Sequence, residues 1–502
     1  MKKASIIVIL LLLLSITGTA FAFNMVNEEK ENVTLSEKTV YGDVSATEGL
    51  AVSRVYNYAW EAFWDVCHVL GENPATSSDF RFQLLQDKSE DAYTQYIELH
   101  SDADRYWDDS DESQASNYFT GIDMAFEDFR NEIGTGNTGS KTVKLKDYYD
   151  YYPISGDYDL LEEYDGWNEP YYLYLQYCME HKPSYVSYGD KDSMALYEFF
   201  NDYFKIPVLD EDTVELNIEK EYNPESDMDE LNYWFAFNGY EMETVSVVSD
   251  DACYFTFTTL SESGQIVDTS QIKGGYGIYM IPITETASGS NIKTADVMQL
   301  SMVYPLDPSE QVFNMVVDEN NSHLLLQSAK DGTYYITVID LDTMKQIQKI
   351  DAGKVLPSSD TYTAIRELQS EIACYESCLY AGDNYIVTVF NENSIIILAE
   401  ENGLYQMEAS IPIEEYNFRF CYISSMDYRD GKLAICCRFH SDDQVCQDFI
   451  ETSFDIVVFD RSKLLYMGNY ADTLSTSTDQ IYDLYSDDDL ILHADTPLIS
   501  WS

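Results

Sequence analysis

Hydrophobic residues in this chain recur in short runs that are separated by turn residues. The clearest example is Val312–Ile350, where Asp, Asn and Gly fill the gaps. These residue types are the ones that tight turns favour. The pattern predicts four strands in succession, Val312–Val317, Leu324–Gln327, Tyr334–Ile339 and Lys345–Ile350. Four short strands with tight turns over about 40 residues form one blade of a β-propeller.

The same rhythm of four runs occurs elsewhere in the chain. Near the amino terminus it predicts the strands Thr39–Val44, Leu50–Tyr58, Phe63–Leu70 and Phe80–Leu85. Three further sets of four strands are predicted later in the chain. One is Thr244–Ser249, Cys253–Leu260, Gln265–Ser270 and Gly277–Ile283, and the next is Ser377–Tyr380, Tyr385–Phe390, Ser394–Ala399 and Tyr405–Ile411. The last is Cys421–Asp427, Lys432–Phe439, Phe454–Asp460 and Leu464–Tyr470.

The carboxyl-terminal set has only three predicted strands, Ile481–Tyr485, Leu490–His493 and Leu498–Trp501. A propeller can close its ring when a strand from the other terminus completes the last blade, and Thr39–Val44 is available for this role. We therefore predict an all-β fold, a β-propeller of about seven four-stranded blades closed by an N-terminal strand. Two stacked β-sandwich domains are the alternative architecture.

Helical patterns interrupt the strands within residues 88–204, a stretch that is also rich in acidic residues and tyrosine. One amphipathic helix is predicted from Ser116, with Gly134 just past its end and an apolar stripe of Phe119, Ile122, Phe126, Phe129 and Ile133. A second is predicted over Ser193–Phe204, with Met194, Tyr197, Phe200 and Phe204 on one side. We expect the first stripe to pack on the rim or face of the propeller, and both helices to be insertions in the N-terminal half.

The amino terminus has the pattern of an export signal. Two lysines precede the apolar run Ala4–Leu14, and Ala20 and Ala22 fit the small residues of a cleavage site. An uncleaved membrane anchor is the alternative, because the uncharged stretch is just long enough to span a bilayer. We predict a signal peptide or anchor over residues 1–22, a flexible tether over 23–38 and the propeller over 39–502. The bulk of the chain would then be extracellular.

Charge restricts the possible partners. The chain has 89 acidic and 29 basic residues, a formal net charge of −60. Such a chain repels phosphate backbones and anionic lipids, so we expect no nucleic-acid partner and contact with a membrane only through the N-terminal segment. Nine cysteines, an odd number without zinc-site spacing, favour buried free thiols over a disulfide framework.

Two acidic clusters are candidate calcium ligands: Asp108, Asp109 and Asp111, and Asp487, Asp488 and Asp489. Ca²⁺ takes six to eight oxygen ligands, but neither cluster has the glycine and glutamate positions of an EF-hand loop. Turns and solvated loops favour Asp in any case, so exposed loops are the favoured interpretation of these clusters and calcium binding is the alternative.

No catalytic residue and no cofactor-binding residue stands out in the sequence. Gly134, Gly136 and Gly139 match a dinucleotide fingerprint by letter, but they follow a predicted helix and precede a strand, which reverses the required order. The six histidines show no metal-ligand spacing. With 89 acids, a carboxylate pair of the kind that glycosidases use can be chosen almost anywhere.

These observations favour an exported binding or scaffold protein that recognises a protein or a glycan at the cell envelope. In this hypothesis a rigid propeller presents loops and insertions to the partner. The alternative is a secreted carbohydrate-active hydrolase with a carboxylate pair in the propeller pocket.

Overall fold

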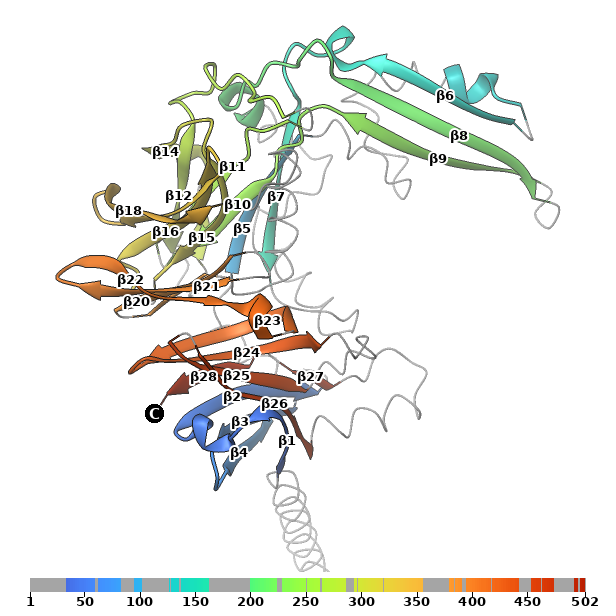
Figure 1. Cartoon of the computed structure of the whole chain (residues 1–502). Helices are drawn as coiled ribbons and strands as arrows, with labels where there is room; N and C mark the ends of the chain where they lie inside the picture. Colours follow the sequence, from blue (N-terminus) through green and yellow to red (C-terminus); the bar gives the residue numbers. More distant parts are fainter. Residues whose placement is uncertain are drawn as a thin grey trace, which may run out of the picture. The chain divides into compact units, whose positions relative to one another are not determined.

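The computed structural model is all-β, built from antiparallel sheets with a few short helices (Figure 1). It describes residues 33–58, 62–82, 94–101, 126, 128–134, 137–161, 199–223, 228–249, 251–261, 264–285, 293–295, 297–318, 320–354, 379–382, 384–390, 394–416, 418–441, 453–461, 463–473, 492–494 and 497–501. Within these residues no helix combines the length and the hydropathy that a membrane span needs. Residues 1–32, which include Ala20 and Ala22, lie outside the described part.

The chain divides into two compact units. Unit 1 contains Met1–Asp91, Gly166–Asn168 and Glu371–Ser502, and unit 2 contains Ala92–Asp165 and Glu169–Ser370. Both chain ends therefore belong to unit 1. The predicted single domain over 39–502 remains a prediction, and each unit is described by itself below.

The described residues of unit 1 form three antiparallel sheets. The first is β19 (Leu379–Gly382), β20 (Tyr385–Phe390), β21 (Ser394–Glu401) and β22 (Leu404–Pro412). The second has the order β1-β26-β25-β24-β23, with β1 Leu35–Gly42, β23 Phe418–Arg429, β24 Lys432–Ser441, β25 Phe454–Asp460 and β26 Lys463–Asp472. The third contains β2 (Leu50–Tyr58), β3 (Ala62–Val69) and β4 (Ala75–Phe82), with β27 (Leu492–Ala494) and β28 (Leu498–Trp501) both paired to β2. Short 3-10 helices are Val44–Thr47 and Ile413–Tyr416.

The strand β25 of the middle sheet of unit 1 is covered on both faces, which explains its nearly continuous apolar run. Along β25 every residue from Phe454 to Phe459 is buried. Alternate residues point to opposite faces of a strand. Val457 and Phe459 accordingly belong to the apolar cluster shared with β20 and β21, whereas Ile456 and Val458 belong to the one shared with β2. A strand buried on both faces reads as a continuous apolar run rather than an alternating one.

The same alternation separates the adjacent cysteines of β24. Cys437 lies in the cluster with β20 and β21, and Cys436 lies in the cluster with β2. Both are free and buried, as is Cys253 in unit 2, and burial raises the pKa of the Cys436 thiol to about 12. The prediction of buried free thiols is confirmed for these three cysteines.

Unit 2 contains two larger sheets and two smaller ones among its described residues (Figure 1). One sheet contains β10 (Thr244–Val248), β11 (Ala252–Phe257), β12 (Gly277–Glu285), β13 (Lys293–Ala295) and β14 (Ser301–Pro305); the other has the order β15 (Gln311–Val317), β16 (His323–Lys330), β17 (Thr333–Asp340), β18 (Lys345–Lys354). Two smaller sheets are β5 (Thr94–Ser101) with β7 (Ile154–Leu161), and β6 (Asn137–Lys144), β8 (Thr213–Asn223) and β9 (Met228–Asn238). Short 3-10 helices are Leu145–Asp147 and Val297–Gln299.

The structure describes the carboxyl-terminal parts of both predicted helices. Residues 128–132 and 199–203 are helical. Phe126, Phe200 and Phe204 are fully buried, and Phe129 and Ile133 pack against the same apolar cluster, which includes Phe255 of β11. Core packing is therefore confirmed for the described residues of the first stripe, and Phe200 and Phe204 of the second pack in the same cluster. Phe119, Ile122, Met194 and Tyr197 lie outside the described residues.

Several predicted strands need correction. Gln265–Ser270 forms no strand, because only Ile266 makes an isolated bridge, to Leu260. The other strands of that sheet are β13 and β14, which the pattern missed. The strand predicted over Phe80–Leu85 begins earlier in the structure, because β4 starts at Ala75, directly after Pro74. The strand β1 begins at Leu35, inside the stretch predicted as a tether.

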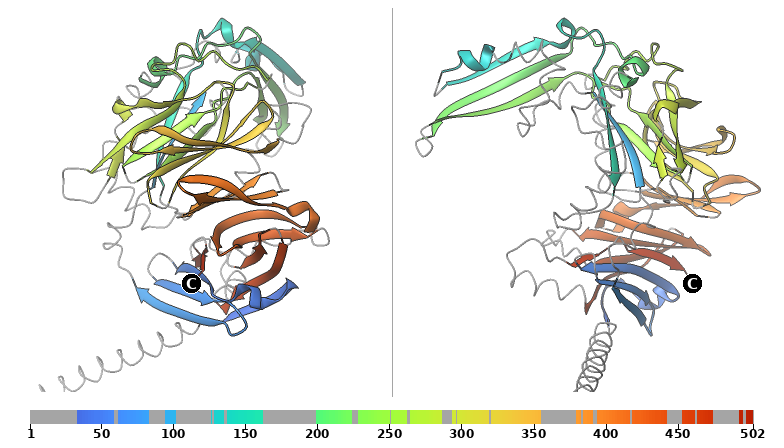
Figure 2. Two further views of the ribbon diagram at one scale, coloured as in Figure 1. Left: turned by 60° about the vertical axis from the view of Figure 1, so that its left-hand side comes forward. Right: turned by 180° about the vertical axis from the view of Figure 1, so that it is seen from behind.

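The predicted partner of the first strand is also wrong. Thr39–Val44 was expected to complete the last, three-stranded set, but β1 pairs with β26 of the preceding set. The strand that receives β27 and β28 is β2, with Leu50 opposite Trp501. Figure 2 shows the amino-terminal strands in blue beside the carboxyl-terminal strands in red. Both ends of the chain are thus joined in unit 1, through a different pairing from the one predicted.

In unit 2, Asp212 is a buried carboxylate just before β8. Its side chain accepts hydrogen bonds from the Tyr152 hydroxyl and, at 2.9 Å, from the backbone N–H of Leu209. Burial nevertheless dominates and raises the pKa of Asp212 to about 6, above its ordinary value of 3.8. Burial thus makes ionisation of Asp212 less favourable in the folded state than in the unfolded chain.

This raised pKa makes the stability of unit 2 depend on pH. The folded state binds more protons than the unfolded state between pH 3.8 and about 6. The free energy of unfolding should therefore fall as the pH rises through this window, by up to about 3 kcal/mol. Urea-induced unfolding of wild type and Asp212→Asn between pH 4 and about 7.5 measures this, and the variant should lose that fall.

The matched control is Asp210→Asn, since the Asp210 side chain is 88% exposed. Its unfolding should follow the wild-type pH dependence. Identical pH profiles for wild type and Asp212→Asn would contradict this account of Asp212.

Candidate binding site at the hairpin end of unit 1

The predicted site residues cannot be located. Asp108, Asp109, Asp111, Asp487, Asp488 and Asp489 lie outside the described residues, so the structure does not test the two calcium clusters. Within the described part of the chain, no group of three or more His, Cys, Asp or Glu side chains could hold a metal ion. The calcium assignment stays a prediction.

A buried network in unit 1 has the residue types of a catalytic triad but serves the fold. Asp472 of β26 accepts a 2.5 Å hydrogen bond from the Tyr56 hydroxyl and lies 3.4 Å from Nε2 of His68, whose Nδ1 is 2.9 Å from the Thr76 hydroxyl. Asp472 and His68 are each 1% exposed. A substrate could not reach these side chains, and the network instead ties β26 to β2 and β3.

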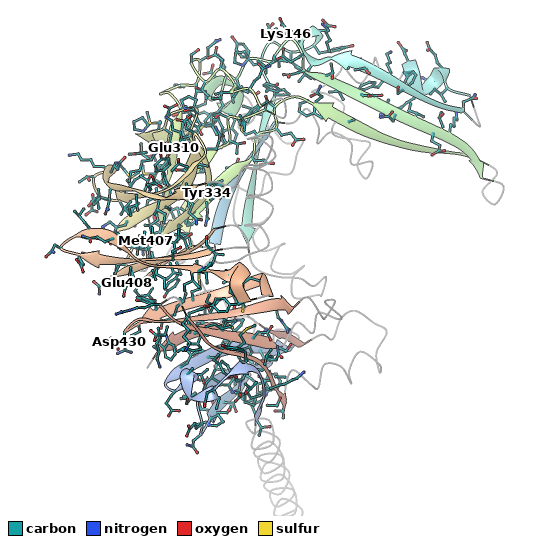
Figure 3. All side chains as sticks on the ribbon, in the orientation of Figure 1. Lys146, Glu310, Tyr334, Met407, Glu408 and Asp430 are labelled. Carbon is teal, nitrogen blue, oxygen red and sulfur yellow. The ribbon has the colours of Figure 1, made fainter. Side chains whose placement is uncertain are left out.

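A more open group of side chains gathers at one end of the unit 1 sheets. We call it the hairpin end, defined by the turns after Gly382, Glu401, Arg429 and Asp460. Antiparallel pairing brings these turns to one end of their two sheets, because β19–β20 and β21–β22 turn together, as do β23–β24 and β25–β26. Figure 3 shows Met407, Glu408 and Asp430 at this end.

The strand β28 reaches the hairpin end through side chains of β23. Ser425 donates a hydrogen bond to the carbonyl of Pro497 (2.8 Å) and accepts one from the N–H of Ile499 (3.2 Å). Arg429 donates to the carbonyl of Trp501 at 2.8 Å. Ser425, Asp427 and Arg429 are alternate residues and so share one face of the strand.

Asp427 joins this strand to the aromatic side chains. Its carboxylate accepts a 2.6 Å hydrogen bond from the N–H of Trp501 and a 2.7 Å bond from the Tyr385 hydroxyl. The Tyr385 oxygen in turn accepts a 3.1 Å bond from the N–H of Tyr428. Burial and the bond to Asp427 raise the pKa of Tyr385 well above its ordinary value, so this phenol remains a donor at neutral pH.

The basic side chains of the site lie at two neighbouring turns, one between β23 and β24 and the other between β25 and β26. The backbone N–H of Arg461 donates to the carbonyl of Gly431 at 2.9 Å, which holds the two turns together. Arg461 has φ of 52°, a left-handed conformation that costs a non-glycine residue about 1–2 kcal/mol. Four of the 29 basic residues of the chain flank these turns: Arg429, Lys432, Arg461 and Lys463. In a chain with three acids for each base, this corner is close to neutral.

The Tyr428 hydroxyl lies among these groups. It is buried, and it has no hydrogen-bond partner among the described residues. Burial, followed by the neighbouring carboxylate of Glu408, raises the pKa of Tyr428, and Arg461 and Asp460 also act on it electrostatically. Glu408 therefore lies close enough to the hydroxyl to raise its pKa. An unpaired buried hydroxyl costs about 1–3 kcal/mol, so a further hydrogen bond to it would be favourable.

The sequence prediction missed this site. One signal was available, because basic residues flank both turns in a strongly acidic chain. The contributions of Trp501 and Glu408 could not have been found, since they depend on which strands pair.

No family model and no curated protein matches this chain. Solved structures align only weakly. KlHsv2 with loop 6CD replaced by a Gly-Ser linker is 7% identical, with 43% of this chain aligned to 60% of that one and a TM-score of 0.20. A putative 6-phosphogluconolactonase from Bacteroides uniformis is 11% identical, over 52% of this chain and 85% of that one, with a TM-score of 0.21.

The β-propeller domain of Swd1 from Myceliophteria thermophila is 8% identical, over 53% of this chain and 83% of that one, with a TM-score of 0.22. The chain thus spans less than two thirds of the length of KlHsv2. At these TM-scores no arrangement is shared in detail, and the account of the site rests on the contacts of this chain alone.

Asp427 should be the most sensitive position of the hairpin end. Asp427→Ala leaves the donors of Trp501 and Tyr385 without their acceptor, and we expect the free energy of unfolding of unit 1 to fall by about 2–4 kcal/mol. Urea-induced unfolding measures this change. The control is Glu401→Ala, an exposed acid at a neighbouring turn, which should stay within about 0.5 kcal/mol of wild type. Equal losses in the two variants would argue against a special role for Asp427.

Proposed function

We propose that this protein is an exported binding or scaffold protein of β-propeller architecture that recognises a protein or a glycan at the cell envelope. The observation that carries this proposal is the hairpin end of unit 1. There, side chains from several turns gather around a buried hydroxyl that has no partner among the described residues. Recognition surfaces combine a few polar groups that converge with apolar or aromatic surface, and such loops are typically positioned by a rigid scaffold.

The sheets support the architecture. A four-stranded meander is the repeating blade of a propeller, and β15–β18 and β19–β22 each form one. Strands from the two ends of the chain pair with each other, β1 with β26 and β28 with β2. This pairing removes strand edges that would otherwise favour aggregation. A closed ring of about seven blades is part of this proposal. Export rests on the N-terminal segment, with residues 1–22 as signal peptide or anchor.

Binding is favoured over hydrolysis because the carboxylates of the hairpin end already interact with other groups of the protein. Asp427 is occupied by Trp501 and Tyr385, and Glu408 lies 3.8 Å from Nε of Arg461. A glycosidase instead needs one carboxyl group as an acid and a second as a base or nucleophile across the scissile bond.

Capture and turnover can be measured in one experiment. The full chain is incubated with cell-envelope glycans and with envelope proteins, and both the retained material and newly formed reducing ends are quantified. We expect capture without new reducing ends. Formation of reducing ends would identify the hydrolase instead, and the absence of capture from both preparations would overturn the binding function.

A further inference from the structure

The position of Glu408 indicates that it is displayed rather than packed. In the pairing of β21 with β22, Ile397 lies opposite Ala409 and Leu398 lies opposite Met407, so Glu408 is the extra residue of a β-bulge. Bulges re-aim a side chain and occur preferentially next to functional sites. The Glu408 side chain is 27% exposed, and it approaches Tyr428 of β23 and Arg461 of the turn between β25 and β26.

The three groups around this point offer both donors and acceptors. Arg461 has only donors, Glu408 has only acceptors when ionised, and the Tyr428 hydroxyl can do both. A sugar hydroxyl also donates and accepts, so adjacent hydroxyls of one ring can satisfy all three groups. An ionic ligand matches less well, because Glu408 and Asp460 repel an anion whereas Arg461 repels a cation.

The long-range field of the protein agrees with a neutral ligand. A formal charge of −60 repels anionic polymers before they reach the local cations. A neutral ligand is indifferent to this field. Apolar surface also lies beside the polar groups, since Leu404 and Met407 of β22 are 47% and 48% exposed. Sugar rings carry C–H faces that such apolar surface can cover.

We propose that Tyr428, Glu408 and Arg461 form a subsite for the hydroxyl groups of a neutral glycan. This inference deepens the proposed binding function and rests on it. In the complex a sugar hydroxyl supplies the missing hydrogen bond of Tyr428, while the Glu408 carboxylate accepts from a neighbouring sugar hydroxyl and Arg461 donates to a sugar oxygen.

Tyr428→Phe tests this subsite, because a purely structural role predicts a different result. Removal of an unpaired buried hydroxyl should leave the melting temperature unchanged or raise it. The same change should weaken glycan binding about fivefold to tenfold. Binding of the full chain to cellohexaose, maltohexaose, mannohexaose and xylohexaose, with hexagalacturonate as the acidic comparison, is measured by calorimetric titration.

Two further variants complete the test. Glu408→Gln keeps the shape but removes the charge, and it should also weaken binding. Tyr151→Phe is the matched control, since Tyr151 is an exposed tyrosine of unit 2 whose hydroxyl bonds to Gln271 at 2.9 Å. It should bind as wild type does.

Each outcome decides a different claim. Wild-type affinity in Tyr428→Phe, with glycan binding intact, would overturn the subsite and leave the binding function standing. Preference for hexagalacturonate would overturn the neutral class. Failure of wild type to bind any of these glycans, with capture of envelope protein retained, would remove the glycan subsite alone. Failure of both would remove the proposed function as well.

Discussion

The last strand of the chain is held from two sides, and the organisation of unit 1 depends on this contact. The backbone of β28 pairs with β2, with Ile499 opposite Val52. Its other side meets Ser425, Asp427 and Arg429 of β23, whose side chains bond to its backbone groups. Without β28, the amino-terminal part of β2 would present an unpaired strand edge, and such edges favour aggregation. Asp427 would also lose one of its donors.

The fold and the candidate binding site share atoms at this contact. Asp427 binds both Trp501 and Tyr385, and Tyr385 in turn accepts from the backbone of Tyr428. The tyrosine proposed to contact the glycan is therefore positioned through the strand that ends the chain. The neighbours of the Tyr428 hydroxyl, Glu408 and Arg461, come from other hairpins. A site of this kind is assembled by strand pairing rather than by a local motif.

This division explains what the sequence could and could not predict. The strands Leu50–Tyr58, Phe454–Asp460 and Leu498–Trp501 were predicted with their observed bounds, because apolar runs and turn residues are local signals. The partner of a strand is not local, and the prediction therefore paired the first strand with the wrong set. Gln265–Ser270 failed for another reason, since a short alternating pattern also fits an irregular loop. The bulge at Glu408 depends on register with β21, which no single strand encodes.

The contact of β28 can be tested by hydrogen exchange of a chain that ends at Pro497. The account predicts that the amides of β2 and β23 lose protection in the shortened chain, whereas those of β16 and β17 in unit 2 exchange as in the full chain. Unchanged protection of β2 and β23 would show that unit 1 does not depend on its last strand, and the central claim would be wrong.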